Sequence, residues 1–319
     1  MMRILPAILL TASVLAIQPA YAQDDKAKKE QAEDGEDLLG LLDEEDGKKG
    51  KEYTTATFKT SRVVNGHSIE NTAAGVLDFK VNHRFGELKG GASTFFGLDN
   101  ANTLIGFDYG ITDWLMIGIS RSTYQKEFLG FTKVKILRQT DNKGGMPLSV
   151  SYYGAASAQA MPAPTLPAGA EYPFSNRMFY VNQLLIARKF NKWLSVQLMP
   201  THIHYNLVPT TPEPNDVIAM GIGGRLKLSN RVSLNAEYYY RFNELNGYFN
   251  SLSLGLDIET GGHVFQLMLT NANAMTERAF IGQTTSDWAD GGIHFGFNIS
   301  RVFTIVKPKE FKSSNTNKW

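Results

Sequence analysis

Alternation of apolar and polar residues runs through the C-terminal two-thirds of this chain in stretches of about ten residues. The clearest stretch is 251–260, where one face would carry Leu252, Leu254, Leu256 and Ile258, and the other Ser253, Gly255, Asp257 and Glu259. Successive side chains of a β-strand point to opposite faces of the sheet. The pattern therefore predicts strands that have one apolar and one polar face.

The alternation predicts about twelve such strands from Gly75 onward. They are expected at residues 75–85, 103–111, 114–123, 127–139, 147–158, 177–190, 193–204, 216–228, 232–242, 251–260, 263–271 and 291–306. Because long helical periods do not interrupt this series, we expect an all-β fold.

The connections between these strands alternate between short and long. Short turns are expected at Thr112-Asp113, Asn191-Lys192, Ser229-Asn230-Arg231 and Gly261-Gly262, and long polar loops at 86–102, 159–176, 205–216 and 271–291. Bacterial outer-membrane barrels have short periplasmic turns and long outer loops. An even strand number gives every short turn to one side, apart from the brief link 124–126, and places both ends of the barrel in the periplasm.

The fold class that follows is a closed, antiparallel, up-and-down transmembrane β-barrel. A soluble sandwich or lipocalin-like barrel would also alternate, but with its apolar face inside. Strand lengths near the roughly 9 to 11 residues of a tilted membrane crossing favour the membrane form. Charges on the polar face favour it too, as do aromatic residues near strand ends: Tyr109, Trp114, Phe128, Phe190, Trp193, Phe242, Tyr248, Phe249 and Phe303.

In a membrane barrel the polar face lines the lumen. The lumen-lining residues expected from the alternation are Asp78, Lys80, Arg84, Asp108, Arg225, Lys227, Glu237, Arg241, Asp257 and Glu259. Their charges are mixed, so they do not predict anion or cation selectivity. They fit a narrow aqueous channel as well as an interior filled by a structural network of ion pairs.

The N-terminus reads as a secretory signal peptide over residues 1–22. A basic start, Met1-Met2-Arg3, precedes an apolar stretch and the small-residue site Ala20-Tyr21-Ala22. The apolar part falls short of the ~20 residues that a helical span needs. The chain contains no cysteine, so thioether lipidation is excluded, and membrane anchoring must come from the fold.

Three further segments complete the domain organisation. Residues 23–52 are highly charged and predicted to be a disordered periplasmic segment, and residues 307–319 form a tail after a barrel over 75–306. The charged segment contains an apolar island that is either a docking motif for a periplasmic protein or part of a linker: Leu38, Leu39, Leu41 and Leu42. Residues 53–74 are surplus to the barrel; their first part, 53–64, is strand-like, and the segment could occupy the lumen as a plug or pair beside the first strand.

Catalytic and cofactor motifs are absent from the sequence: there is no Gly-rich phosphate loop, zinc-protease motif, nucleophile elbow or haem-attachment motif. His202 and His204 share one face of a strand and are weak metal candidates. His294 and Ser300 lie on the polar side, whereas a lipid hydrolase needs its His-Ser pair at the lipid-facing wall. No cofactor is expected, and the net charge of +1 gives no indication of a nucleic-acid partner.

Several ordered stretches resemble an uncharacterised family of bacterial β-barrels known as a domain of unknown function. They are 57–62 with 65–68, 96–102, 108–110, 183–190, 207–209 with 213–216, 223–229, 236–240, 257–266 and 294–301. The resemblance covers roughly residues 54–303 and extends to the island at 38–42. It implies a barrel in the outer membrane and supplies no catalytic residues.

These observations predict an outer-membrane barrel that contacts lipid and acts as a passive channel, or as a transport or binding barrel for a small solute or apolar ligand. The alternative is a non-conducting structural barrel that recruits a periplasmic partner through residues 23–52. A third class, a lipid-modifying hydrolase, would require His202 or His294 to act in turnover.

Overall fold

The computed structural model describes residues 52–141, 145–166, 171–208, 213–243 and 245–307. Twelve strands are present: β1 (Val76–Glu87), β2 (Ala101–Gly110), β3 (Leu115–Ser122), β4 (Glu127–Leu137), β5 (Ser149–Gln159), β6 (Met178–Lys189), β7 (Leu194–Tyr205), β8 (Asp216–Lys227), β9 (Val232–Arg241), β10 (Ser251–Thr260), β11 (His263–Thr270) and β12 (His294–Thr304). Each predicted strand is confirmed, with ends that differ by a few residues.

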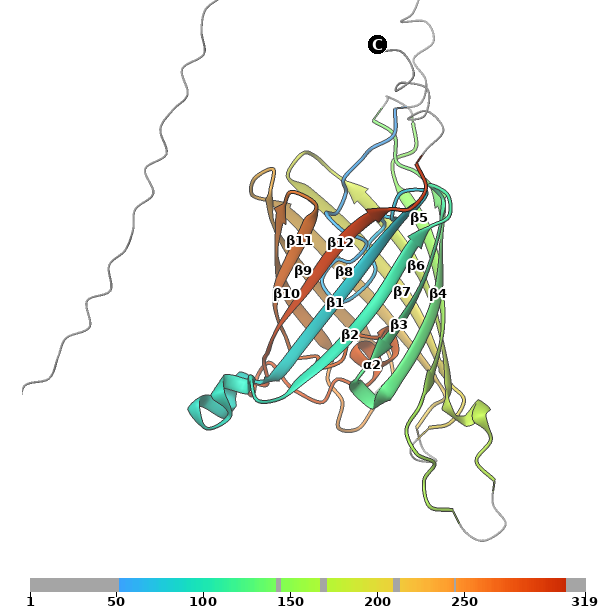
Figure 1. Ribbon diagram of the computed structural model, residues 1–319, viewed down its shortest axis with the longest axis vertical. Coiled ribbons are helices and arrows are strands. Elements are labelled where there is room, and N and C mark those ends of the chain that lie inside the picture. Colours follow the sequence, from blue (N-terminus) through green and yellow to red (C-terminus); the bar gives the residue numbers. More distant parts are fainter. Residues whose placement is uncertain (1–51, 142–144, 167–170, 209–212, 244, 308–319) are drawn as a thin grey trace, which may run out of the picture. The chain divides into compact units, whose positions relative to one another are not determined.

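Each strand pairs antiparallel with its neighbours in the sequence, and β1 closes the barrel by pairing with β12 (Figure 1). The closing pairs run from Val76 opposite Thr304 to Glu87 opposite His294, with one irregularity after Arg84. The predicted closed, up-and-down, all-β architecture is therefore confirmed. A closed barrel leaves no strand edge unpaired, as a membrane-spanning sheet requires.

Most short turns and long loops lie at opposite mouths of the barrel, as predicted. The exceptions are the β4–β5 connection, which is long but at the short-turn mouth, and the brief link between β3 and β4 at the long-loop mouth. The short-turn mouth carries the turns 111–114, 190–193, 228–231 and 261–262. The long-loop mouth carries most of the short helices: η2 (Leu88–Gly97), η3 (Tyr124–Lys126), η4 (Phe174–Arg177) and α2 (Glu277–Gly282). In Figure 1 the short-turn mouth is at the top and the long-loop mouth at the bottom.

The apolar face of the strands points outward. Along β9, Leu234, Ala236, Tyr238 and Tyr240 are exposed while Ser233, Asn235, Glu237, Tyr239 and Arg241 are buried. The same division holds along β1 and β10. A soluble barrel would bury the apolar set, so the outward apolar wall is that of a barrel surrounded by lipid.

Aromatic side chains lie exposed near both mouths, where an interfacial girdle is expected. Trp114 and Trp193 are each more than half exposed at the short-turn mouth. Phe128 and Phe242 are similarly exposed at the long-loop mouth. Tyr248 departs from the predicted girdle, because it lines a cavity inside the long-loop mouth.

The interior also contains an apolar core, which the alternation did not predict. Many of the inward-facing residues of β3 to β8 are apolar and buried: Met116, Leu129, Phe131, Tyr153, Ala155, Val181, Leu185, Met199, Ile203, Val217 and Ala219. They pack with two segments that are not part of the wall. These are the N-terminal segment (residues 53–74) and the α2 loop (residues 271–293, between β11 and β12).

The predicted strand over residues 53–64 is wrong. The N-terminal segment forms only isolated bridges, namely Tyr53 with Thr140, Arg62 with His67, and Ala74 with Gly110. Its last residues meet β2, and the rest runs inside the barrel (Figure 1). A segment enclosed by a complete barrel has no strand edge to pair with, so its β propensity is not realised.

Among the described residues, no helix is both long enough and apolar enough to cross a membrane. The predicted signal peptide at 1–22, the charged segment at 23–52 with its Leu38 to Leu42 island, and nearly all of the tail at 307–319 lie outside the described residues.

The barrel interior as candidate functional site

The predicted lumen residues face inward and most are enclosed. Eight of the ten are buried: Asp78, Lys80, Arg84, Asp108, Arg225, Glu237, Arg241 and Asp257. Lys227 is partly exposed, and Glu259 is exposed at the short-turn mouth, where it forms an ion pair with Lys59. Other parts of the protein therefore shield the polar inner wall from bulk water. The hydrogen bonds identify the cover as the N-terminal segment.

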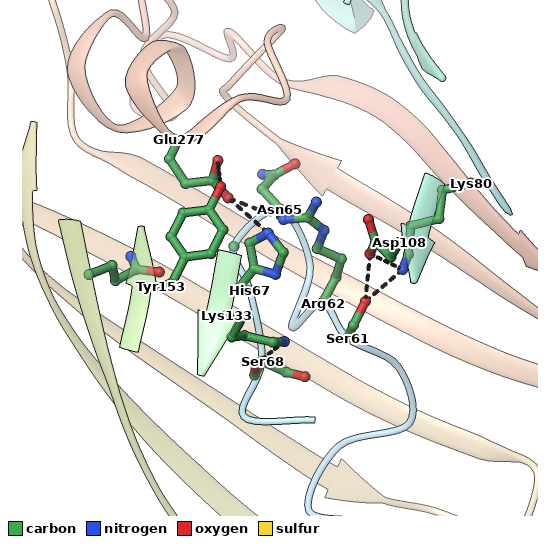
Figure 2. Close-up of polar contacts among 12 residues, drawn as sticks. Ser61, Arg62, Asn65, His67, Ser68, Lys80, Asp108, Lys133, Tyr153 and Glu277 are labelled. Carbon is green, nitrogen blue, oxygen red and sulfur yellow. Dashed lines mark hydrogen bonds and ion pairs between the residues drawn. The ribbon is translucent and has the colours of Figure 1, made fainter. Parts of the chain in front are cut away.

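Lys80 holds a compact charge cluster on the first two strands. Its Nζ lies 2.6 Å from Asp78 Oδ2 and 2.6 Å from Asp108 Oδ2. The same Nζ donates to Ser61 Oγ at 2.6 Å, so one residue of the N-terminal segment completes the cluster (Figure 2). One ammonium between two carboxylates satisfies all three buried groups, because Lys has three donors.

Glu237 on β9 binds the backbone of the N-terminal segment. Its carboxylate accepts the N–H groups of three consecutive residues, Val64 (3.2 Å), Asn65 (2.7 Å) and Gly66 (3.1 Å). Hydrogen bonds to an ionised acceptor are among the stronger ones in proteins. A Cβ at Gly66 would lie 2.0 Å from Tyr239 Oη, so only glycine allows this approach.

Further wall side chains donate to the carbonyl groups of the segment. Lys133 Nζ bonds Ser68 O at 3.0 Å and Glu70 O at 2.5 Å, and Gln197 Nε2 bonds His67 O at 2.8 Å. Arg225 Nη1 bonds Ala56 O at 2.7 Å and Thr57 O at 3.1 Å, and Asn298 Nδ2 bonds Val64 O at 3.1 Å. Strands from all around the barrel thus satisfy backbone groups that have no strand partner.

Arg84 forms no ion pair with a carboxylate of the described residues. Its Nη2 and Nε donate to Asn65 Oδ1 at 2.6 and 3.2 Å, and its Nη1 donates to Asn298 Oδ1 at 2.9 Å. A buried charge of this kind is tolerable only with several hydrogen bonds. Arg84 on β1 therefore connects Asn65 of the N-terminal segment with Asn298 on β12, across the β1–β12 closure.

Apolar side chains of the segment fill spaces that wall glycines leave. Val63 and Val64 are 0% and 1% exposed. A Cβ at Gly223 on β8 would lie 3.1 Å from Val63 Cγ1, and one at Gly255 on β10 would lie 3.1 Å from Val64 Cγ2. The segment thus combines polar anchoring with close packing, as protein interiors do.

The α2 loop enters from the long-loop mouth and meets the N-terminal segment. Arg62 Nη1 lies 3.1 Å from Glu277 Oε1, and Tyr153 Oη donates to Glu277 Oε2 at 2.9 Å (Figure 2). His67 Nε2 lies 3.7 Å from the same carboxylate, with its ring against Phe131 and Tyr153. Burial lowers the pKa of His67 well below its usual value, and the charges of Arg62 and Lys133 act in the same direction.

A second, fully buried ion pair fixes α2 to the wall. Arg278 Nη2 lies 2.7 Å from Glu127 Oε2, and both side chains are 0% exposed. Thr276 Oγ1 donates to the same carboxylate oxygen at 2.8 Å, and the Arg278 guanidinium lies 4.3 Å from the centre of the Phe179 ring. The loop is thereby tied to β4 and β6.

Six buried polar residues of the interior were not predicted from the alternation: Arg62, His67, Glu127, Lys133, Glu277 and Arg278. The apolar run Ala279-Phe280-Ile281, completely buried, was the available signal that the loop 271–291 enters the barrel. Lys133 and Glu127 were hidden because the inward face of β4 also carries Leu129 and Phe131, which blurs the alternation.

The histidine candidates take other partners. His202 Nε2 and His204 Nδ1 both lie 2.8 Å from Asp216 Oδ1 on the outward face. Among the described residues, no three His, Asp or Glu side chains are arranged so that they could hold a metal ion. His294 contacts Ser286 Oγ at 3.1 Å, while Ser300 Oγ donates to Asp78. His294 and Ser300 therefore do not form a nucleophile–base pair.

This fold and interior define a class: a membrane-bound β-barrel whose lumen contains part of its own chain. Within that class the chain belongs to the family described as "Membrane bound beta barrel domain (DUF5777)", which matches residues 58–303. The predicted family resemblance is thus confirmed. No curated protein matches the chain.

Solved porin structures are similar at low identity. The NanC porin is 9% identical over 72% of this chain and 100% of its own, with a TM-score of 0.46. The KdgM porin is 7% identical over 72% of this chain and 99% of its own, with a TM-score of 0.43. The outer membrane protein Omp33 of Acinetobacter baumannii is 10% identical over 71% and 97%, with a TM-score of 0.36.

Proposed function

We propose that the protein is an outer-membrane channel that its own N-terminal segment holds closed as a plug. The observation that supports this proposal is the set of hydrogen bonds that wall side chains form with the backbone of the segment. These side chains are Glu237, Lys133, Gln197, Arg225 and Asn298. A twelve-stranded barrel is wider than the eight-stranded barrels that side chains alone can fill. The spare width is occupied by a separate length of chain.

The chemistry of the wall supports a plug that can leave. Withdrawal of the segment would expose Lys80, Asp78, Asp108, Glu237 and Arg225, which water can hydrate. The segment joins the barrel only through Gly75 at the short-turn mouth, so it could leave by that mouth without opening the wall. The mixed charges of this lining fit a passive channel for small solutes.

The test is single-channel conductance in planar bilayers. Mature protein (residues 23–319) is compared with variants that lack 23–74 or only 23–52. We expect steady conductance when 23–74 is absent, and a mainly closed barrel in the other two. Heat-dependent migration in detergent gels confirms that each barrel is folded. Silence of a folded barrel without 23–74 would overturn the proposal.

A disulfide lock tests the same proposal without deletion. The chain has no cysteine, and a Cβ at Gly223 would lie 3.1 and 3.5 Å from the two methyl carbons of Val63. This spacing suits a disulfide between Val63→Cys and Gly223→Cys. We expect the oxidised protein to stay closed and the reduced protein to show opening events; Gly223→Cys alone is the control. Identical traces before and after reduction would contradict a removable plug.

The second candidate is a non-conducting barrel that recruits a periplasmic partner through residues 23–52. The observation that favours it is the close packing of Phe58, Val63, Val64 and Ile69, all at most 2% exposed, which resembles a permanent core. On this alternative the reduced and oxidised forms are equally silent. Replacement of Leu38, Leu39, Leu41 and Leu42 by Ser would then abolish partner capture and leave the barrel folded.

A further inference from the structure

A cavity of about 380 Å³ lies at the long-loop mouth, beside the end of α2. Its lining includes the amide residues Gln125, Gln159, Asn176 and Gln283 and the aromatic residues Tyr172 and Tyr248. This volume lies within the range of small-molecule sites. The plug proposed above does not use these residues.

A buried arginine orients two of the amides. Arg278 Nη2 donates to Gln125 Oε1 at 3.0 Å, and Nη1 donates to Gln283 Oε1 at 2.7 Å. Gln159 donates to the same oxygen of Gln125. The side-chain oxygens of Gln125 and Gln283 therefore accept hydrogen bonds from the protein. Because a carboxamide carries its nitrogen opposite its oxygen, the NH₂ group of each residue is left to donate to a ligand in the cavity.

The support behind these amides is rigid. Arg278 is itself held by its ion pair with Glu127, and both are fully buried. Gln125 has a left-handed backbone conformation with φ of 50°, which is unusual for a residue other than glycine. Strained residues of this kind are concentrated at binding sites, where the surroundings hold them in place.

The aromatic side of the cavity is also anchored. The guanidinium of Arg177 lies 5.1 Å from the centre of the Tyr172 ring. The carbonyl of Tyr248 accepts a hydrogen bond from Arg241 Nη2 at 2.7 Å. Aromatic faces offer a flat apolar surface, and a tyrosine adds a hydroxyl at its edge.

The cavity lining is uncharged: its residues are Gln, Asn, Tyr, Phe, Met, Leu and Val. The positive charge that holds the two amides, Arg278, is balanced by Glu127. Oriented amide donors beside aromatic faces suit a ring compound with many hydroxyl acceptors and apolar C–H faces. We propose that this cavity binds a neutral carbohydrate.

This site does not depend on whether the barrel conducts, so the two proposals can fail separately. The test is saturation-transfer NMR and calorimetric titration of the full mature protein in detergent. Maltotriose is the probe, with a galacturonic acid oligomer as the charged analogue and trialanine as the peptide alternative. We expect maltotriose to bind and the other two to bind at least tenfold more weakly.

Variants locate the binding. Gln283→Ala and Gln125→Gly each remove one NH₂ group, and glycine tolerates the φ of 50°. Each should weaken maltotriose binding about tenfold, the effect of one lost hydrogen bond. Asn246→Ala removes an exposed amide at the same mouth outside the cavity and should change nothing.

Three results would overturn the proposal. They are no saccharide binding by folded protein, stronger binding of the galacturonic acid oligomer or of trialanine, and maltotriose binding that Gln283→Ala and Gln125→Gly leave unchanged. Heat-dependent gel migration verifies that each variant is a folded barrel.

Discussion

The N-terminal segment and the α2 loop enter the same lumen from opposite mouths, but the barrel holds them differently. The segment has no regular structure, and wall side chains bond mostly to its backbone. The α2 loop forms a short helix that is held mainly through charged side chains, with Arg278 paired to Glu127 and Glu277 to Arg62. The attachment of the segment is spread over many hydrogen bonds, whereas that of the α2 loop depends mainly on two buried ion pairs.

The two modes predict different sensitivities to substitution. Backbone contacts survive most side-chain changes within the segment, except at Gly66, where Tyr239 leaves no room. A buried ion pair fails at a single substitution, because the remaining charge is left unpaired in the interior. The α2 loop should therefore be the more fragile attachment.

The largest effect is expected from Arg278→Met. It leaves Glu127 buried and unpaired, which should lower the free energy of unfolding by about 3–5 kcal/mol. Denaturant titration of the barrel in detergent, with protease cleavage of residues 271–293, measures the loss. Adding Glu127→Leu should recover most of it.

The matched control for that change is Lys59→Met. It breaks the ion pair between Lys59, whose side chain is 7% exposed, and Glu259, whose side chain is 49% exposed. The carboxylate that remains is hydrated, so the change should cost at most about 1 kcal/mol. If Arg278→Met and Lys59→Met lowered the free energy of unfolding equally, burial would not explain the difference between the two ion pairs.

A smaller effect is expected from Glu237→Gln, which removes the charge that accepts three backbone N–H groups. The local opening free energy should fall by about 1.5–3 kcal/mol. Hydrogen exchange of the Val64, Asn65 and Gly66 amides reports it. Asp257→Asn is the control, because this buried carboxylate accepts from Gln266 of the wall. If α2 amides exchange faster to the same extent, the two segments open as one unit and the comparison fails.

The smallest effect concerns pH. The folded pKa of His67 lies below its unfolded value near 6.5, so the stability it contributes is present above that value and is lost as pH falls below it. Between pH 7 and pH 6 the segment should loosen by less than about 1 kcal/mol. Amide exchange at residues 62–68, corrected for its intrinsic pH dependence, measures this loosening. In His67→Gln that part of the pH dependence should vanish; its persistence would assign it to other groups.

The wall of this barrel is readable in the sequence because lipid and lumen impose opposite demands on alternate residues. Strand β9 shows the rule along most of its length, with Ala236 outside and Glu237 inside, although Tyr239 faces inward to the apolar core. Gly261-Gly262 and Asn191-Lys192 mark turns by local preferences alone. Such features depend on neighbours in the sequence, and they were predicted to within a few residues.

The interior is less readable, because its contacts join residues that are far apart in the sequence. Lys133 and Phe131 face inward together, since one bonds the carbonyls of the N-terminal segment and the other packs on His67. The sequence around β4 does not indicate that these two side chains contact the N-terminal segment. Helix α2 has six residues, which are too few to show a helical period in the sequence. Its two charged residues, Glu277 and Arg278, are typical in sequence of a hydrated loop, although both are buried.

The bonds of the N-terminal segment also set an order of assembly. Val64 O accepts from Asn298, 234 residues further along the chain, and Arg84 reaches the same asparagine across 214 residues. Contacts of such long sequence separation form late in folding. The N-terminal segment, which is synthesised before the barrel strands, must therefore be among the last parts to find its place, because Asn298 can bind it only after the twelfth strand has formed.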